Sequence, residues 1–120
     1  MASYPKQNLW VLDSVWERAK VRAKDIDRMP LGTVLDALLR DYAAGLIAVD
    51  VSADTGRGGG RGTKNLGINR THWDAAVGRA EADSLSGSRL AELLLTDYAE
   101  GRIELTVTVR VLKQSQTTAT

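Results

Sequence analysis

The chain has 120 residues and a formal net charge of +1, because 16 basic residues are balanced by 15 acidic ones. This length fits one domain or two very small ones, and no apolar run approaches the roughly 20 residues that a membrane helix requires. The sequence contains no cysteine, which excludes disulfides and thiolate metal sites. With no disulfide scaffold and no signal peptide, we expect a cytoplasmic protein.

The first part of the chain predicts a strand followed by a helix. Residues 6–12, KQNLWVL, alternate between apolar and polar side chains, which is typical of a short strand with one apolar face. Asp13 or Ser14 can cap the next helix, because a short side-chain oxygen there accepts from free backbone N–H groups. Helical spacing then places four apolar residues on one stripe, namely Val15, Ala19, Ala23 and Ile26.

A second helix is expected after a turn at residues 27–30, since Pro30 suits the first turn of a helix and Gly45 suits its C-terminal end. Its broad apolar face consists of Leu31, Val34, Leu35, Leu38, Leu39 and Tyr42. Residues 46–51, LIAVDV, have the composition of a strand. Residues 54–63, DTGRGGGRGT, predict a flexible linker because glycine loses much entropy when it is ordered.

Residues 64–101 predict the same succession of strand, helix, turn and helix. Leu66 and Ile68 are expected to face inward, and Asn69 or Thr71 to cap the next helix. The apolar faces of the two helices contain Trp73, Ala76, Val77 and Ala80, and then Leu90, Leu93, Leu94 and Tyr98. Residues 103–112, IELTVTVRVL, give the strongest strand signal in the chain.

The two parts repeat one another. Trp16 matches Trp73 and Arg22 matches Arg79 at the same spacing, whereas Tyr42 and Tyr98 are one residue closer together, so one residue is lost between the helices of the second copy. A unit this small would struggle to bury a core alone, and we expect the copies to share one. The predicted organisation is a first unit at 6–45, a strand and linker at 46–63, a second unit at 64–101, a C-terminal strand at 102–112 and a disordered tail at 113–120.

No arrangement of residues typical of an enzyme stands out. His72 is the only histidine, so a histidine cluster cannot form. Asp41 and Asp97 recur late in helices with acidic faces, where solvation or helix contact explains them better than acid–base chemistry. The order Gly62-Thr63-Lys64 is wrong for a phosphate-binding loop, which leaves a linker or a basic arm that contacts nucleic-acid phosphates. We therefore predict no enzyme, no metal site and no cofactor.

The outward faces of the two predicted strands are more informative. A lone short strand needs a partner, and its own duplicate is the nearest one. Antiparallel pairing would give a ribbon that displays polar side chains on one face, and a two-stranded ribbon fits the major groove of DNA. Asparagine can make two hydrogen bonds to an adenine edge there, although Asn8 and Asn65 can also be ordinary exposed residues. The outward residues are Lys6, Asn8, Trp10, Thr63, Asn65 and Gly67.

On these features the sequence resembles the ribbon-helix-helix DNA-binding family, the repressors of the Arc, MetJ and CopG type. The resemblance rests mainly on the second copy, with its alternating strand, its Leu85-Ser86-x-Ser88 helix start and its Tyr98-x-x-Gly101 ending. It implies an α+β, mostly helical fold. Two tandem units would pair in one chain as an intramolecular pseudo-dimer, with additional C-terminal strands.

The resemblance also implies which residues contact double-stranded DNA. In the family, a helix start clamps a phosphate with its backbone amides. Pro30 removes one such N–H from the first copy, and the serines are absent there, which implies a weaker clamp. Bases would be read by Lys6, Asn8, Thr63 and Asn65, and the DNA backbone contacted by Trp10, Lys64, Arg70, Ser86, Gly87, Ser88 and Gly32.

Three functions follow as hypotheses. The leading one is a transcriptional repressor that acts at the nucleoid by occupying its operator, with pseudo-dimers able to associate side by side. The second is a DNA-bending accessory or partition factor of a plasmid or other mobile element. The third is an antitoxin or protein-interaction module in which residues 103–112 add a strand to a partner's sheet.

Overall fold

A computed structural model describes residues 6–49 and 60–103 of the chain. In this part the predicted α+β, mostly helical class is confirmed, with one two-stranded antiparallel sheet and four α-helices. The elements, in chain order, are β1 (Lys6–Leu12), α1 (Asp13–Arg22), the π-helical turn η1 (Ala23–Asp27), α2 (Leu31–Ala43), β2 (Arg61–Gly67), α3 (Arg70–Ala82) and α4 (Gly87–Ala99).

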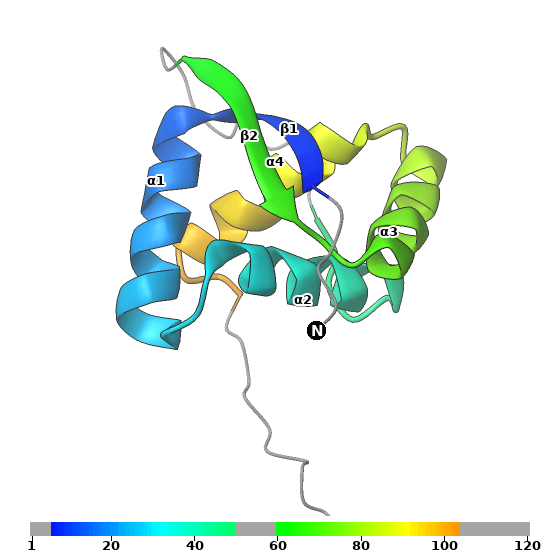
Figure 1. The fold of residues 1–120 in the computed structure, drawn as a ribbon. Coiled ribbons are helices and arrows are strands. Elements are labelled where there is room, and N and C mark those ends of the chain that lie inside the picture. Colours follow the sequence, from blue (N-terminus) through cyan, green and yellow to red (C-terminus); the bar gives the residue numbers. More distant parts are fainter. Residues whose placement is uncertain (1–5, 50–59, 104–120) are drawn as a thin grey trace, which may run out of the picture.

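The two strands pair with each other and lie together across one side of the helices (Figure 1). The antiparallel register sets Asn8 opposite Asn65 at the centre of the ribbon, with Lys6 opposite Gly67 near one end. Successive side chains of a strand face opposite sides, and Leu9 and Val11 are accordingly buried against the helices. The other face of the ribbon is exposed and carries polar side chains together with Trp10.

The first half of the chain runs from β1 to α2 and the second half from β2 to α4. The two halves pack against each other through their helices. The first helix of each half packs against the second helix of the other half, since α1 contacts α4 and α2 contacts α3. Burial of their apolar faces is the main favourable contribution to the fold. Because both halves supply this one core, neither has a complete core alone. Its most deeply buried residues include Leu35, Leu38, Leu39, Leu90, Leu94 and Leu95.

The extra residue of the first half is accommodated in η1. The carbonyl of Ala23 accepts from the N–H of Met29 at 3.0 Å, and that of Ala80 accepts from the N–H of Leu85 at 2.9 Å, which is one residue nearer in sequence. An inserted residue in a helix commonly forms such a π turn. The turn also explains a wrong prediction: Ile26, expected on the buried stripe, is 61% exposed because η1 departs from the α-helical spacing.

Helices α2 and α4 end alike. Gly45 and Gly101 both have φ of +81°, a left-handed conformation that glycine adopts without strain. The N–H of Leu46 donates to the carbonyl of Asp41 at 2.8 Å, as in a Schellman motif. The predicted stop at Gly45 is confirmed.

Two reciprocal clusters connect the halves. The Tyr42 hydroxyl donates to Asp83 Oδ2 at 3.1 Å, and the guanidinium of Arg79 lies 5.4 Å from the centre of the Tyr42 ring. The Tyr98 hydroxyl donates in the same way to Asp27, and Arg22 lies 5.3 Å from its ring. Burial, assisted by these hydrogen bonds, raises the pKa of both tyrosines.

Three predicted strands differ from the structure or lie partly outside the described residues. Residues 46–49 are not a strand, and the rest of the expected 46–51 strand lies outside the described residues. Strand β2 begins at Arg61, inside the expected linker, because residues 61–63 complete the ladder with β1. The expected C-terminal strand at 102–112 lies outside the described residues, except Arg102 and Ile103, which are not in a strand. The tail at 113–120 lies wholly outside them.

The capping prediction is confirmed at one strand–helix junction and is wrong at the other. Asn69 caps α3, and its side chain accepts from the N–H groups of Thr71 and His72. The prediction that Asp13 or Ser14 caps α1 is wrong, because the helix begins at Asp13 with Leu12 in the cap position and no side-chain cap bond. The N–H of Leu12 instead donates to Glu92 on α4.

Candidate nucleic-acid interface

The outward face of the ribbon carries a row of exposed side chains. Asn8 and Asn65 lie opposite each other at its centre, and Trp10, 57% exposed, lies opposite Thr63. The structure therefore places all four expected base-reading residues on one strand pair with their side chains accessible. The exposed residues of the two strands are Lys6, Asn8, Trp10, Arg61, Thr63 and Asn65.

Two residues expected at the DNA backbone have partners within the protein. Lys64 is half-buried opposite Leu9, and its ammonium forms an ion pair with Asp13 at the start of α1. Arg70 lies in the first turn of α3 and forms an exposed ion pair with Asp74 at 3.1 Å. Both cations are thus partly compensated before any ligand approaches.

A hollow of about 440 Å³, here called the α4 hollow, lies between the ribbon and the start of α4. Ser86 caps this helix, and its Oγ accepts from the N–H of Arg89 at 3.1 Å. Ser88 Oγ accepts from the N–H of Trp10 at 2.9 Å, which ties the helix start to the ribbon. The lining residues are Trp10, Arg61, Ser86, Ser88, Arg89 and Glu92.

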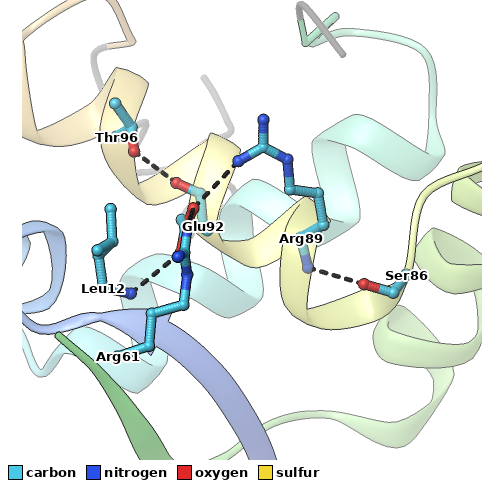
Figure 2. A network of polar contacts seen from close by, with 6 residues as sticks. All are labelled: Leu12, Arg61, Ser86, Arg89, Glu92 and Thr96. Atoms are coloured by element: carbon cyan, nitrogen blue, oxygen red, sulfur yellow. Dashed lines mark hydrogen bonds and ion pairs between the residues drawn. The ribbon is translucent and has the colours of Figure 1, made fainter. Parts of the chain in front are cut away.

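A buried carboxylate organises the α4 hollow. Glu92 is only 1% exposed, and Figure 2 shows how Leu12, Arg61 and Arg89 converge on it. Its oxygens accept from the N–H of Leu12 at 3.0 Å, from Arg61 Nη2 at 3.0 Å and from Arg89 Nη1 at 3.1 Å. The hydrogen bond and charge of Glu92 raise the pKa of Arg61. Two guanidiniums against one carboxylate leave this hollow basic.

A smaller hollow of about 200 Å³, here called the α2 hollow, lies at the start of α2 and is lined by Gly32, Thr33, Asp36 and Gly67. Asp36 accepts from the N–H of Asn69 at 3.3 Å, and its Oδ1 lies 2.9 Å from His72 Nδ1. None of these lining residues is basic. The cap position is Pro30, which makes no side-chain cap bond.

The glycines expected in the two clamps are packed closely. A Cβ on Gly87 would lie 2.7 Å from two ring atoms of Trp73, so the Trp73 ring covers the first turn of α4. A Cβ on Gly32 would lie 3.3 Å from the carbonyl oxygen of Gly67 on the ribbon. Both positions require close approach between elements, whether or not a ligand binds.

Sequence reasoning missed the acids that hold the strand–helix junctions. Glu92 accepts from the N–H of Leu12, and Asp36 accepts from the N–H of Asn69. A usable signal was present, because Asp36 and Glu92 recur at the same spacing as Tyr42 and Tyr98. Aspartate and glutamate differ in type, which hid the match.

No family model, curated protein or solved structure matches the chain. Within residues 6–49 and 60–103, no helix is long and apolar enough to cross a membrane. The same ranges contain no group of three or more histidine, cysteine or acidic residues able to hold a metal ion.

Proposed function

We propose that this chain is a sequence-specific double-stranded DNA-binding protein that acts as a transcriptional repressor. Its two halves would form a ribbon-helix-helix pseudo-dimer within one chain. The observation that carries the proposal is the register of the ribbon, in which Asn8 lies opposite Asn65 with both side chains exposed.

The ribbon would read bases from the major groove. A two-stranded ribbon fits that groove, and an asparagine amide can donate to and accept from an adenine edge at once. Asn8 and Asn65 are central, so they would reach the base edges first. Lys6 and Thr63 flank them on the same outward face and would contact the neighbouring bases.

The α4 hollow would hold a phosphate beside the groove. A helix N-terminus attracts anions through its free N–H groups and its dipole, and Arg61 and Arg89 add positive charge at the same place. Phosphate contacts fix the register of a protein on DNA without reading sequence. The hollow would thereby position the ribbon over its bases.

The two ends of the ribbon would contact the DNA unequally, because the α2 hollow has an acidic lining residue and no basic one. A site matched to such a protein would be only partly palindromic, since half-sites mirror the symmetry of the protein. Repression would follow from occupancy of that site, which excludes polymerase.

The test is selection from a random duplex pool, followed by binding of variants to the selected site. Asn65→Ala and Asn8→Ala should each weaken binding by about 1–3 kcal/mol, because each removes hydrogen bonds to one base. Gln7→Ala is the matched control, since Gln7 neighbours Asn8 but alternates to the other face of the ribbon. Unchanged affinity in both asparagine variants would rule out base reading by the ribbon.

Trp10 favours a second candidate, a DNA-bending accessory factor. Its ring is 57% exposed on the DNA-reading face proposed above, and apolar wedges inserted between base steps kink DNA. Circularly permuted DNA fragments measure the bend. A bend that is lost in Trp10→Ala while the selected motif is still bound would favour the accessory role.

A further inference from the structure

A groove of about 690 Å³, here called the α1 groove, is lined by residues of α1, the turn after it, the start of α2 and β2. Figure 1 shows the chain turning back from α1 into α2, with the end of β2 above the start of α2. Sites for small molecules commonly have volumes of about 300–1,000 Å³. The α1 groove therefore has the size of a site for a small molecule.

The floor of the α1 groove is apolar. Leu66 reaches it from the inward face of β2, next to the base-reading Asn65 but on the opposite side of the strand. Val21 is 58% exposed, and exposed apolar surface in a recess commonly marks a binding site. The apolar side chains that line the groove include Trp16, Val21, Met29, Leu31 and Leu66.

The rim of the α1 groove is basic. Lys20 forms a long ion pair of 3.9 Å with Glu17, which also lines the groove. Lys24 and Arg28 are exposed and form no ion pair with any residue that the structure describes. The rim thus offers two cations whose charge the described part of the protein leaves uncompensated.

The matched place in the second half is filled. Gly87 stands there where the first half has Leu31, and a Cβ on Gly87 would lie 2.7 Å from the Trp73 ring. The ring therefore covers the start of α4. The side chain of Leu31 prevents Trp16, the match of Trp73, from covering the start of α2 in the same way. The space in the first half remains open as the α1 groove.

The basic rim is also a property of the first half alone. Glu81 matches Lys24, and Ser84 matches Arg28. Arg28 and Ser84 share a left-handed backbone, with φ of 57° and 62°. The turn therefore accounts for the backbone conformation at Arg28 but does not require its charge.

We propose that the α1 groove binds an amphipathic monocarboxylate, a small molecule with one carboxylate and an apolar tail, such as a medium-chain fatty acid. The tail would lie on the apolar floor, where its burial removes apolar surface from water. The carboxylate would accept charge-assisted hydrogen bonds from Lys24 and Arg28. One carboxylate fits better than a surface of many negative charges, because Glu17 also lines the groove and would repel a second anion. This inference does not rest on the proposed DNA-binding function.

The test is isothermal titration calorimetry of the full chain with decanoate, below the concentration at which decanoate forms micelles. We expect one molecule to bind per chain. Decyltrimethylammonium has the same tail and the opposite charge, and should bind about 10-fold more weakly or not at all. Acetate has the carboxylate without the tail and should not bind.

Variants of the rim locate the site. Lys24→Glu should weaken decanoate binding about 10-fold, because a repulsion replaces an attraction. Arg28→Ser should weaken it about 3-fold, since it removes one exposed charge while placing at the turn the residue found in the second half. Arg18→Glu is the control, because it makes the same charge change on α1 but faces Glu100 at 3.7 Å. Circular dichroism checks that each variant is folded.

Equal affinity for decanoate and decyltrimethylammonium would overturn the proposal, because the basic rim would then have no role. Equal affinity of Lys24→Glu and Arg18→Glu for decanoate would place the ligand elsewhere and would also overturn it. A chain that ignores decanoate, including one that instead binds an acidic peptide or an anionic vesicle, would do the same. DNA is absent from every titration, so these outcomes are independent of DNA binding.

Discussion

The starts of α2 and α4 lie at matched places beside the ribbon, yet they differ in charge and shape. The α4 hollow has two arginines, two serines and a buried glutamate, whereas the α2 hollow has Asp36 and no basic lining residue. In a protein built from two identical chains, one substitution would alter both ends. Here the two ends are formed by different residues of one chain, so a substitution can alter one end alone.

The comparison also shows what both ends retain. At each end, an acid on the second helix of one half accepts from the backbone N–H that precedes the first helix of the other half. Glu92 bonds to Leu12 at 3.0 Å and Asp36 to Asn69 at 3.3 Å. This bond closes the strand–helix junction across the halves. The arginines around Glu92 are an addition found at one end.

The largest expected effect comes from removing the two acids. Glu92→Ala should lower the free energy of unfolding by about 3 kcal/mol, at the low end for a broken buried ion pair, because Arg61 and Arg89 can still reach water. Asp36→Ala should cost about 1 kcal/mol, as expected for a partly exposed hydrogen-bonding group. Urea denaturation measures both. Equal losses would show that burial of Glu92 does not distinguish the two ends.

Substituting alanine for Gly87 and for Gly32 should give the next largest difference in stability between the two ends. The new Cβ of Gly87→Ala would lie 2.7 Å from the Trp73 ring, and that of Gly32→Ala 3.3 Å from the Gly67 carbonyl oxygen. We expect Gly87→Ala to cost about 1–3 kcal/mol, as overpacking does, and Gly32→Ala to cost less. Thermal unfolding monitored by circular dichroism tests this order, with Gly78→Ala as a control because its Cβ would meet open space.

The two tyrosine clusters should contribute differently to the loss of stability at alkaline pH. Burial and then the bond to Asp27 raise the pKa of Tyr98, and burial and the bond to Asp83 raise that of Tyr42 less strongly. Both folded pKa values exceed the unfolded value of about 10, so the stability contribution is present below pH 10 and is lost as pH rises above it.

The measurement is the fall in Tm between about pH 9 and pH 11. Tyr98→Phe should reduce this fall more than Tyr42→Phe, because it removes the more strongly shifted group. An undiminished fall in Tyr98→Phe would mean that its phenol does not control the alkaline transition.

Much of the fold could be predicted from the sequence because its signals are local. The bounds of β1 follow from alternation, and the stop at Gly45 from a residue tolerant of positive φ. A short polar side chain narrowed the cap of α3 to Asn69 or Thr71, and the structure selects Asn69. Repetition added a long-range expectation, namely that the two strands pair with each other, which the register bears out.

The rest depends on contacts that neither half specifies alone. Glu92 lies on a helix whose acidic residues suggested a solvated face, and only the packing of α4 on β1 buries it. The one-residue difference between the copies was visible, but the sequence does not show that a π turn absorbs it and exposes Ile26.

The smallest expected effect comes from adding a positive charge to the α2 hollow, and this change tests the comparison of the two ends most directly. Thr33→Arg places a guanidinium beside Asp36, at the position that Arg89 occupies in the α4 hollow. If both ends face DNA phosphates, one added contact should steepen the slope of log affinity against log salt by about 1. A gain is cleaner evidence than Arg89→Ala, which would also disturb Glu92. Ala44→Arg adds the same charge at the far end of α2 and should leave the slope unchanged. Equal slopes in all three proteins would mean that the α2 end does not approach the DNA backbone.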